Sequence, residues 1–164
     1  MSLTFPNFNA AKNKAKEVLE GNLIVEPPVV AQKLAESYEL DVRYYIFKLE
    51  YKEVAGFIDV SKNTIAVNGE DSPARQNFTI AHELGHYLLG HDLDGTEYTC
   101  LFRDPTKQKN TPIEQEANCF AANLLVPTMM LQRYLDRFSF ADDEQLSRIF
   151  GVSTDVIRFR RLYL

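Results

Sequence analysis

The sequence predicts an α+β fold: a small antiparallel sheet followed by a mostly helical remainder. Two observations lead to this prediction. Segments rich in β-branched and aromatic residues cluster between residues 42 and 67, and the segments after Gly69 follow helical spacing. Strands followed by helices, rather than alternating with them, are typical of α+β proteins. The 164 residues have the usual size of one domain, so we expect a single domain over residues 1–164.

Helices are expected both before and after the strands along the chain. One covers Phe8 to Leu19, and a second begins at Pro27-Pro28, because proline is tolerated in a first turn. The expected strands are Val42 to Leu49, Val54 to Val60 and Ile65 to Val67, with a turn at Ser61 to Asn63. Later helices are expected at Ser72 to Leu89, Thr111 to Leu125, Thr128 to Phe138, Asp142 to Phe150 and Ser153 to Leu162. The segment His91 to Thr111 is expected to be a long loop.

Composition excludes several classes of protein. The net charge of −5 and the pI near 5.2 have the wrong sign for a protein that binds phosphate backbones, so we expect no direct nucleic-acid partner. No apolar run approaches the ~20 residues of a membrane-spanning helix, and the N-terminus carries no secretion signal. Cys100 and Cys119 lack metal-binding spacing and suit a reducing compartment. A cytoplasmic protein without a membrane partner is expected.

The motif HELGH at residues 82–86 lies within the strongest helical segment. Residues four apart lie on one helix face, so His82 and His86 are predicted to bind one metal ion. Glu83 is one step around the helix, which suits a general base that takes a proton from a zinc-bound water. The flanking residues are apolar, so this helix is expected to be buried.

A zinc site of this kind needs a third protein ligand. The metzincin pattern requires glycine at position 89 and histidine at position 92, but the sequence has Leu89 and Asp92. His91 is one residue out of register, and one residue turns a helical side chain by about 100°. We therefore interpret His91 as a helix C-terminal residue favoured by the helix dipole rather than as a ligand.

The other source of a ligand is the helix that starts near Pro112. Glu114 has the small residues Ala117 and Ala121 on its face, together with Asn118, so this face can approach the histidine helix closely. Glu114 is the predicted ligand, and Asn118 is expected to bond the distal nitrogen of a zinc histidine. Glu116 is the alternative ligand, but Phe120 lies one turn ahead of it and is expected to pack into the core or hold the helices apart.

Two segments resemble the ImmA/IrrE family of zinc metallo-endopeptidases: NFTIAHELGHYLLGH at 77–91 and EQEANCFAANLLVP at 114–127. The similarity extends over about residues 24–162. It implies a zincin-like core with Zn²⁺ held by His82, His86 and Glu114, and with Glu83 as the catalytic residue. It also implies a protein partner, because family members cleave helix-turn-helix transcriptional repressors.

We therefore expect an intracellular zinc-dependent endopeptidase that cleaves a helix-turn-helix repressor. The alternative is a regulatory interaction domain with a structural or vestigial zinc site. A DNA-binding role for the C-terminal helix pair is disfavoured by the net charge, and this pair is interpreted as packed helices with a basic, solvated end. Tyr87, Tyr98 and Tyr134 are candidate oxyanion-stabilising donors, but core packing explains each of them. Arg75 is expected to pair with nearby acidic residues.

Overall fold

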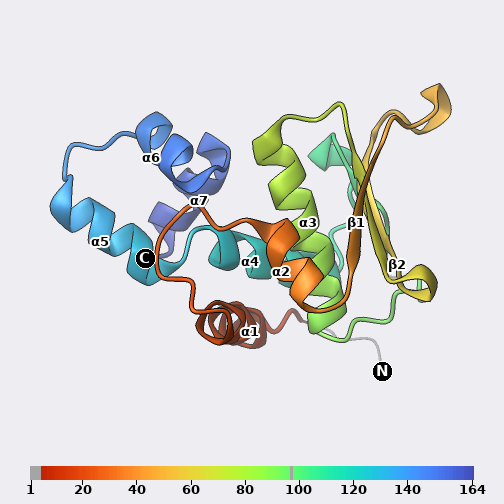
Figure 1. The fold of residues 1–164 in the computed structure, drawn as a ribbon, viewed down its shortest axis with the longest axis horizontal. Helices are drawn as coiled ribbons and strands as arrows, with labels where there is room; N and C mark the ends of the chain where they lie inside the picture. The colour runs from red at the N-terminus through yellow and green to blue at the C-terminus, as the bar shows by residue number, and fades with distance from the viewer. Residues whose placement is uncertain (1–4, 97) are drawn as a thin grey trace.

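The computed structural model describes residues 5–96 and 98–164 and has the predicted α+β architecture, with a four-stranded sheet and seven α-helices in the described residues (Figure 1). The strands are β1 (Asp41–Tyr45), β2 (Val54–Asp59), β3 (Thr64–Asn68) and β4 (Leu101–Phe102). The helices are α1 (Phe8–Gly21), α2 (Ala31–Ser37), α3 (Pro73–Leu88), α4 (Pro112–Leu125), α5 (Thr128–Arg137), α6 (Asp143–Phe150) and α7 (Thr154–Leu162).

The central element is α3, which lies between the sheet and α4, while α5, α6 and α7 gather at the end of the molecule farthest from the sheet (Figure 1). Ser72 caps α3 by accepting a hydrogen bond from the Arg75 N–H, and Pro73 occupies the first turn, as the sequence predicts. Ile80, Ala81 and Leu84 are fully or almost fully buried. None of the described helices is long and apolar enough to cross a membrane.

The prediction of an all-antiparallel sheet is wrong. The strand order is β1-β3-β2-β4: β2 pairs antiparallel with β3 and β4, but β1 pairs parallel with β3. The strands β1, β2 and β3 do alternate in direction along the chain, and the turn before β3 is the predicted one, with Asn63 in the left-handed region at φ 48°. However, β3 lies between β1 and β2, so β1 and β3, which run in the same direction, become neighbours.

The predicted start of the second helix is also wrong. It begins at Ala31 rather than at Pro27-Pro28, and Val30 before it is extended. Asn77 of α3 accounts for the difference. Its side-chain oxygen accepts from the Ala31 N–H, and its side-chain nitrogen donates to the Val29 carbonyl, so this backbone is held extended against α3.

Two further departures lie near the sheet. The strand expected to reach Leu49 ends at Tyr45, and residues 49–51 form a 3₁₀ turn. Within the predicted loop, Leu101–Phe102 forms the short edge strand β4, which brings this loop against β2. The edge of the sheet therefore lies next to the loop that connects α3 to α4.

Candidate metal centre

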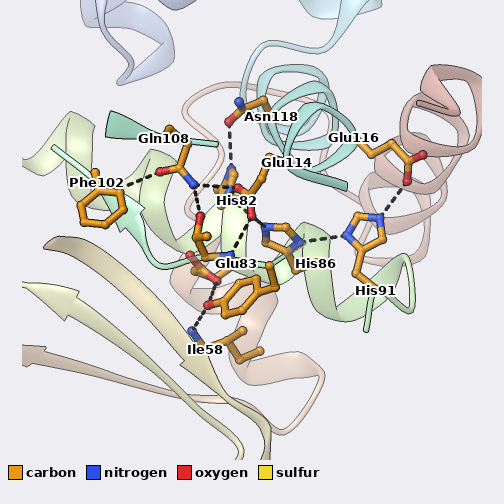
Figure 2. A network of polar contacts seen from close by, with 12 residues as sticks. Ile58, His82, Glu83, His86, His91, Phe102, Gln108, Glu114, Glu116 and Asn118 are labelled. Atoms are coloured by element: carbon orange, nitrogen blue, oxygen red, sulfur yellow. Dashed lines mark hydrogen bonds and ion pairs between the residues drawn. The ribbon is translucent and has the colours of Figure 1, made fainter. Parts of the chain in front are cut away.

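The two histidines of α3 point their Nε2 atoms at one spot. One helical turn separates His82 and His86, and their Nε2 atoms are 3.1 Å apart (Figure 2). Both side chains are completely buried. Their rings meet edge to face, with centroids 4.7 Å apart, so both nitrogens reach the same point from one helix face.

Glu114, in the first turn of α4, supplies a carboxylate to this point. Its Oε2 is 3.2 Å from His82 Nε2, and its Oε1 is 3.4 Å from His86 Nε2. One atom from each of the three residues lies within 4.8 Å of the others, and this is the group with metal-binding geometry found among the described residues. The structure thus brings together the three residues that the sequence selects, and it leaves Glu116 away from them.

Close packing of α3 and α4 makes this arrangement geometrically feasible. A Cβ added to Gly85 would lie 2.8 Å from Cδ1 of Phe120, so the Phe120 ring occupies the space that a side chain at Gly85 would need. Of the two outcomes expected for Phe120, packing into the core is confirmed, and the ring does not hold the helices apart. The ring is fully buried against α3 because the motif carries glycine at this position.

Outer hydrogen bonds orient both imidazoles. Asn118 Oδ1 lies 2.9 Å from His82 Nδ1, which confirms the predicted contact. His86 Nδ1 lies 2.9 Å from Nδ1 of His91, for which the sequence predicts only a role at the helix terminus. Since the Nδ1 atoms of both histidines contact Asn118 and His91, the two Nε2 atoms remain directed toward Glu114.

The protonation states of this cluster suit a cation. Burial is the largest influence on His86, lowering its pKa to about 4. Burial alone would raise the pKa of Glu114, but its close contacts with the imidazoles of His82 and His86 outweigh it and lower the pKa to about 2. At pH 7 a neutral imidazole therefore faces an ionised carboxylate, and these are the forms that bind metal. Converging acceptors of this kind fit a divalent cation.

Glu83 lies beside the cluster and is completely buried. The Tyr98 hydroxyl donates to Glu83 Oε2 at 3.0 Å and accepts from the Ile58 N–H at 3.1 Å. Glu83 Oε1 has no hydrogen-bond partner among the described residues. Burial raises the pKa of Glu83 well above its usual value, and the nearby charge of Glu114 raises it further.

The loop between α3 and α4 covers the cluster. The Thr99 N–H donates to Glu114 Oε1 at 3.2 Å, and the Gln108 side chain donates to Glu114 Oε2 at 3.1 Å. Gln108 also accepts from the Phe102 N–H at 3.0 Å, which ties β4 to the same carboxylate (Figure 2). The sequence interpretation misses the roles of Tyr98 and Gln108. Only the unusual length of the loop indicates that it belongs to a site.

The remaining candidates lie outside the cluster. Tyr134 packs on Phe150, with ring centroids 5.7 Å apart, as predicted for a core residue. Arg75 donates to the Phe102 carbonyl at 2.5 Å, so this hydrogen bond joins backbone rather than the expected acidic side chain. In the C-terminal pair, Arg158 and Arg161 form ion pairs with Asp143, and Arg160 is buried.

An HExxH helix joined by a glutamate from the next helix, beside a small sheet, defines the candidate site of a metallopeptidase. The sequence profile of the IrrE N-terminal-like domain (Peptidase_M78) matches residues 35–161. The chain therefore belongs to this family, and it is a distant homologue of the ImmA and IrrE metallopeptidases.

Two named metallopeptidases illustrate the match. Metallopeptidase ImmA of Bacillus subtilis is 28% identical over 120 residues, which cover 72% of this chain and 69% of the relative. Radiation response metalloprotease IrrE of Deinococcus radiodurans is 34% identical over 84 residues, which cover 51% of this chain and 25% of the relative. The chain thus matches about a quarter of that longer protein.

Two other matches are more limited. An uncharacterized immunity region protein 2 of Bacillus phage phi105 is 30% identical over 95 residues, covering 57% of this chain and 58% of the relative. Among solved structures, a Mycobacterium tuberculosis transcriptional regulator superposes with a TM-score of 0.59 over 93% of this chain and 45% of that protein. At 15% identity, this likeness concerns the fold alone.

Proposed function

We propose that this protein is a zinc-dependent endopeptidase whose ligands are His82, His86 and Glu114. The observation that carries the proposal is the convergence of these three buried side chains within 4.8 Å, next to the buried carboxylate of Glu83. Two imidazoles and one carboxylate form a donor set typical of catalytic zinc, because three protein ligands leave a fourth position for water or substrate. Zinc, when bound, supplies Lewis acidity to a water molecule and to the scissile carbonyl.

Glu83 is the proposed general base. Its Oε2 is held by the Tyr98 hydroxyl, while Oε1 has no partner among the described residues and is available to accept a proton. The raised pKa of Glu83 strengthens it as a proton acceptor and lets it pass the proton on to the leaving amine. Tyr98 positions the carboxylate by bridging it to the Ile58 N–H of β2.

The proposed substrate is a helix-turn-helix transcriptional repressor. Membership of the ImmA/IrrE family supports this class of substrate, as does the match to a phage immunity region protein. The burial of the centre under the loop from Tyr98 to Gln108 also favours a narrow substrate range, because a peptide reaches the centre only when the part of this loop around Gln108 moves away from Glu114.

The test is cleavage of a candidate repressor encoded beside the gene for this protein. Zinc-loaded wild type is expected to generate defined fragments that mass spectrometry assigns to one bond. Glu83→Gln is expected to retain about one zinc per chain and to generate none, whereas His82→Ala is expected to lose the metal. Elemental analysis distinguishes zinc from manganese. Loss of zinc by Glu83→Gln as complete as that by His82→Ala would make Glu83 a ligand and contradict its role as base.

A regulatory interaction domain with a structural or vestigial zinc site is the second candidate. The closed centre favours it, because the side chains of His82, Glu83, His86 and Glu114 are at most 1% exposed. Under this alternative, wild type and Glu83→Gln bind the repressor equally, measured by fluorescence anisotropy, and neither cleaves it. Cleavage that depends on Glu83 would exclude it.

A further inference from the structure

A second row of buried side chains lies behind His86, on the side away from Glu114. His86 Nδ1 lies 2.9 Å from His91 Nδ1, and His91 Nε2 lies 2.7 Å from Glu116 Oε2 (Figure 2). The side chains of His91 and Glu116 are 4% and 5% exposed. Glu116 Oε1 in turn accepts a hydrogen bond of 2.6 Å from the backbone N–H of Asn7, the residue whose side chain caps the start of α1. These hydrogen bonds form a continuous row from the start of α1, through Glu116 and His91, to His86.

The end of α3 directs His91 back onto His86. The His91 N–H donates to the His86 carbonyl, and the Gly90 N–H donates to the Tyr87 carbonyl. Gly90 itself adopts φ +68°. Together these form a Schellman motif, in which a left-handed glycine reverses the chain after a helix. Because of this reversal, the residue after Gly90 lies against the last turn of the helix that carries both metal-binding candidates.

With His91 neutral, the hydrogen bonds in this row have a single consistent direction. An ionised carboxylate has only acceptors, so Glu116 accepts from Asn7 at one oxygen and requires a proton on His91 Nε2 at the other. Neutral His91 then has a lone pair on Nδ1, and that nitrogen accepts from a proton-bearing Nδ1 of His86. The remaining nitrogen of His86, Nε2, therefore carries its lone pair toward His82 and Glu114.

We propose that His91 and Glu116 are positioning residues that fix the tautomer and the ring orientation of His86 for metal binding. The proposal rests on the proposed zinc function of the site, which it deepens. Neither residue touches the metal. His91 acts on His86, and Glu116 acts through His91. Partners of this kind typically change metal affinity by about 10- to 100-fold when they are removed.

Glu116→Gln is the sharpest variant because an amide cannot accept hydrogen bonds from both neighbours, as the carboxylate does. If the amide oxygen accepts from Asn7, the amide nitrogen faces His91 Nε2 and reverses every donor in the row, which puts a proton on His86 Nε2. If the amide is flipped, its nitrogen meets the Asn7 N–H, and two donors oppose each other. In both orientations the change in volume is minimal.

Zinc affinity, measured by competition with a chromophoric chelator, tests the proposal. His91→Leu and Glu116→Gln are expected to weaken binding by about 10- to 100-fold. His91→Gln is expected to bind within a few-fold of wild type, because its amide keeps one acceptor and one donor at the tip. Glu114→Ala, which removes a ligand, sets the lower reference. Leu131→Ala, a buried change in α5, controls for lost stability alone.

Imidazole nitrogen NMR of the metal-free protein provides a readout independent of zinc. His86 is expected to carry its proton on Nδ1 in wild type and His91→Gln, and to lose this preference in Glu116→Gln. Wild-type affinity in both His91→Leu and Glu116→Gln, or an unchanged His86 tautomer in Glu116→Gln, would overturn the proposal. Absence of zinc binding by wild type would instead overturn the proposed function, so the two failures are distinguishable.

Discussion

His86 and Glu114 show how burial and close partners set charge in this site. Burial lowers the pKa of His86 to about 4, whereas close contacts with two imidazoles lower the pKa of Glu114 to about 2 in spite of its burial. Both shifts favour the metal-binding forms at neutral pH. Both also link the stability of the metal-free protein to pH, because the unfolded chain has ordinary pKa values.

We predict that metal-free protein loses stability as the pH falls from 7 to 4.5. Unfolded His86 takes up a proton near the ordinary histidine pKa of 6.5, but folded His86 does so only near 4, so the unfolded state gains protons first. The loss is on the order of 2 kcal/mol over this window. Glu114 adds its own loss below about 4.5, the ordinary pKa of a glutamate.

The contribution of Glu83 to stability changes with pH in the opposite direction, because its pKa is raised in the folded protein. The measurement is therefore made on proteins that carry Glu83→Gln. Urea unfolding with a chelator, followed by circular dichroism because the chain has no tryptophan, gives the free energy at each pH. Adding His86→Asn is expected to flatten the profile above pH 4.5. An equally steep profile in both variants would assign the effect to another group.

The close contact between α3 and α4 depends on the glycine at position 85. Gly85→Ala would place a methyl group 2.8 Å from Cδ1, 3.1 Å from Cγ and 3.3 Å from Cβ of Phe120, and the ring has no flexible end that can move away. Overpacking costs about 1–3 kcal/mol, whereas replacing a helical glycine by alanine gains about 0.5–1 kcal/mol. The steric cost is therefore expected to dominate.

We predict a lower melting temperature and weaker zinc binding for Gly85→Ala, because separating α3 from α4 moves Glu114 away from the histidines. Gly21→Ala, at the end of α1, is the matched control, since nothing lies within 4 Å of its added methyl group. That variant is expected to be neutral or slightly stabilised. Unchanged zinc affinity in Gly85→Ala would show that the helix separation does not control the ligand geometry.

Local spacing predicts the elements that carry the site, but not how the strands pair. The HExxH helix and the Glu114 helix follow from caps and from four-residue periodicity, both of which are encoded within a few residues. Pairing of β1 with β3, by contrast, depends on the insertion of β3 between β1 and β2. The start of α2 depends on Asn77, which lies 46 positions away from Ala31. No local pattern contains this information.

The same limit applies to the centre as a whole. The candidate metal cluster and the proposed base Glu83 are predicted from two short motifs, whereas His91, Tyr98 and Gln108 contact them through chain reversals that spacing does not describe. Gly90 is the one local signal for His91, because glycine after a helix indicates a left-handed turn. Glu116 does not belong to the cluster of His82, His86 and Glu114, as the sequence predicts, although the predicted reason, that Phe120 holds the helices apart, does not apply. The Glu116 side chain instead contacts His91, which in turn contacts His86.

Arg160 joins the C-terminal helices to the rest of the molecule. It is 1% exposed, and it donates to the Val126 carbonyl at 2.9 Å and to the Thr128 hydroxyl at 2.6 Å, where α4 passes into α5. Arg160→Met keeps the aliphatic stem but leaves the Val126 carbonyl without this donor. We predict a loss of about 2 kcal/mol or more in the free energy of unfolding.

Arg158→Met, on the same helix with its side chain 61% exposed, is the control and is expected to change stability by at most about 1 kcal/mol. If residues 1–164 form one domain, as the sequence predicts, unfolding of wild type and Arg160→Met should each give a single transition by two independent probes. Two separate transitions in wild type would contradict the single-domain prediction.

The loop that covers the site connects the two helices that carry the proposed metal ligands. His86 precedes it on α3, Glu114 follows it on α4, and Gln108 within it bonds the same carboxylate. A cation bound by both residues would act as a reversible cross-link that closes this loop and stabilises the folded state against any opening that separates α3 from α4. Metal content would thereby set how readily a foreign protease cuts between His91 and Thr111, and chelation would expose that segment first.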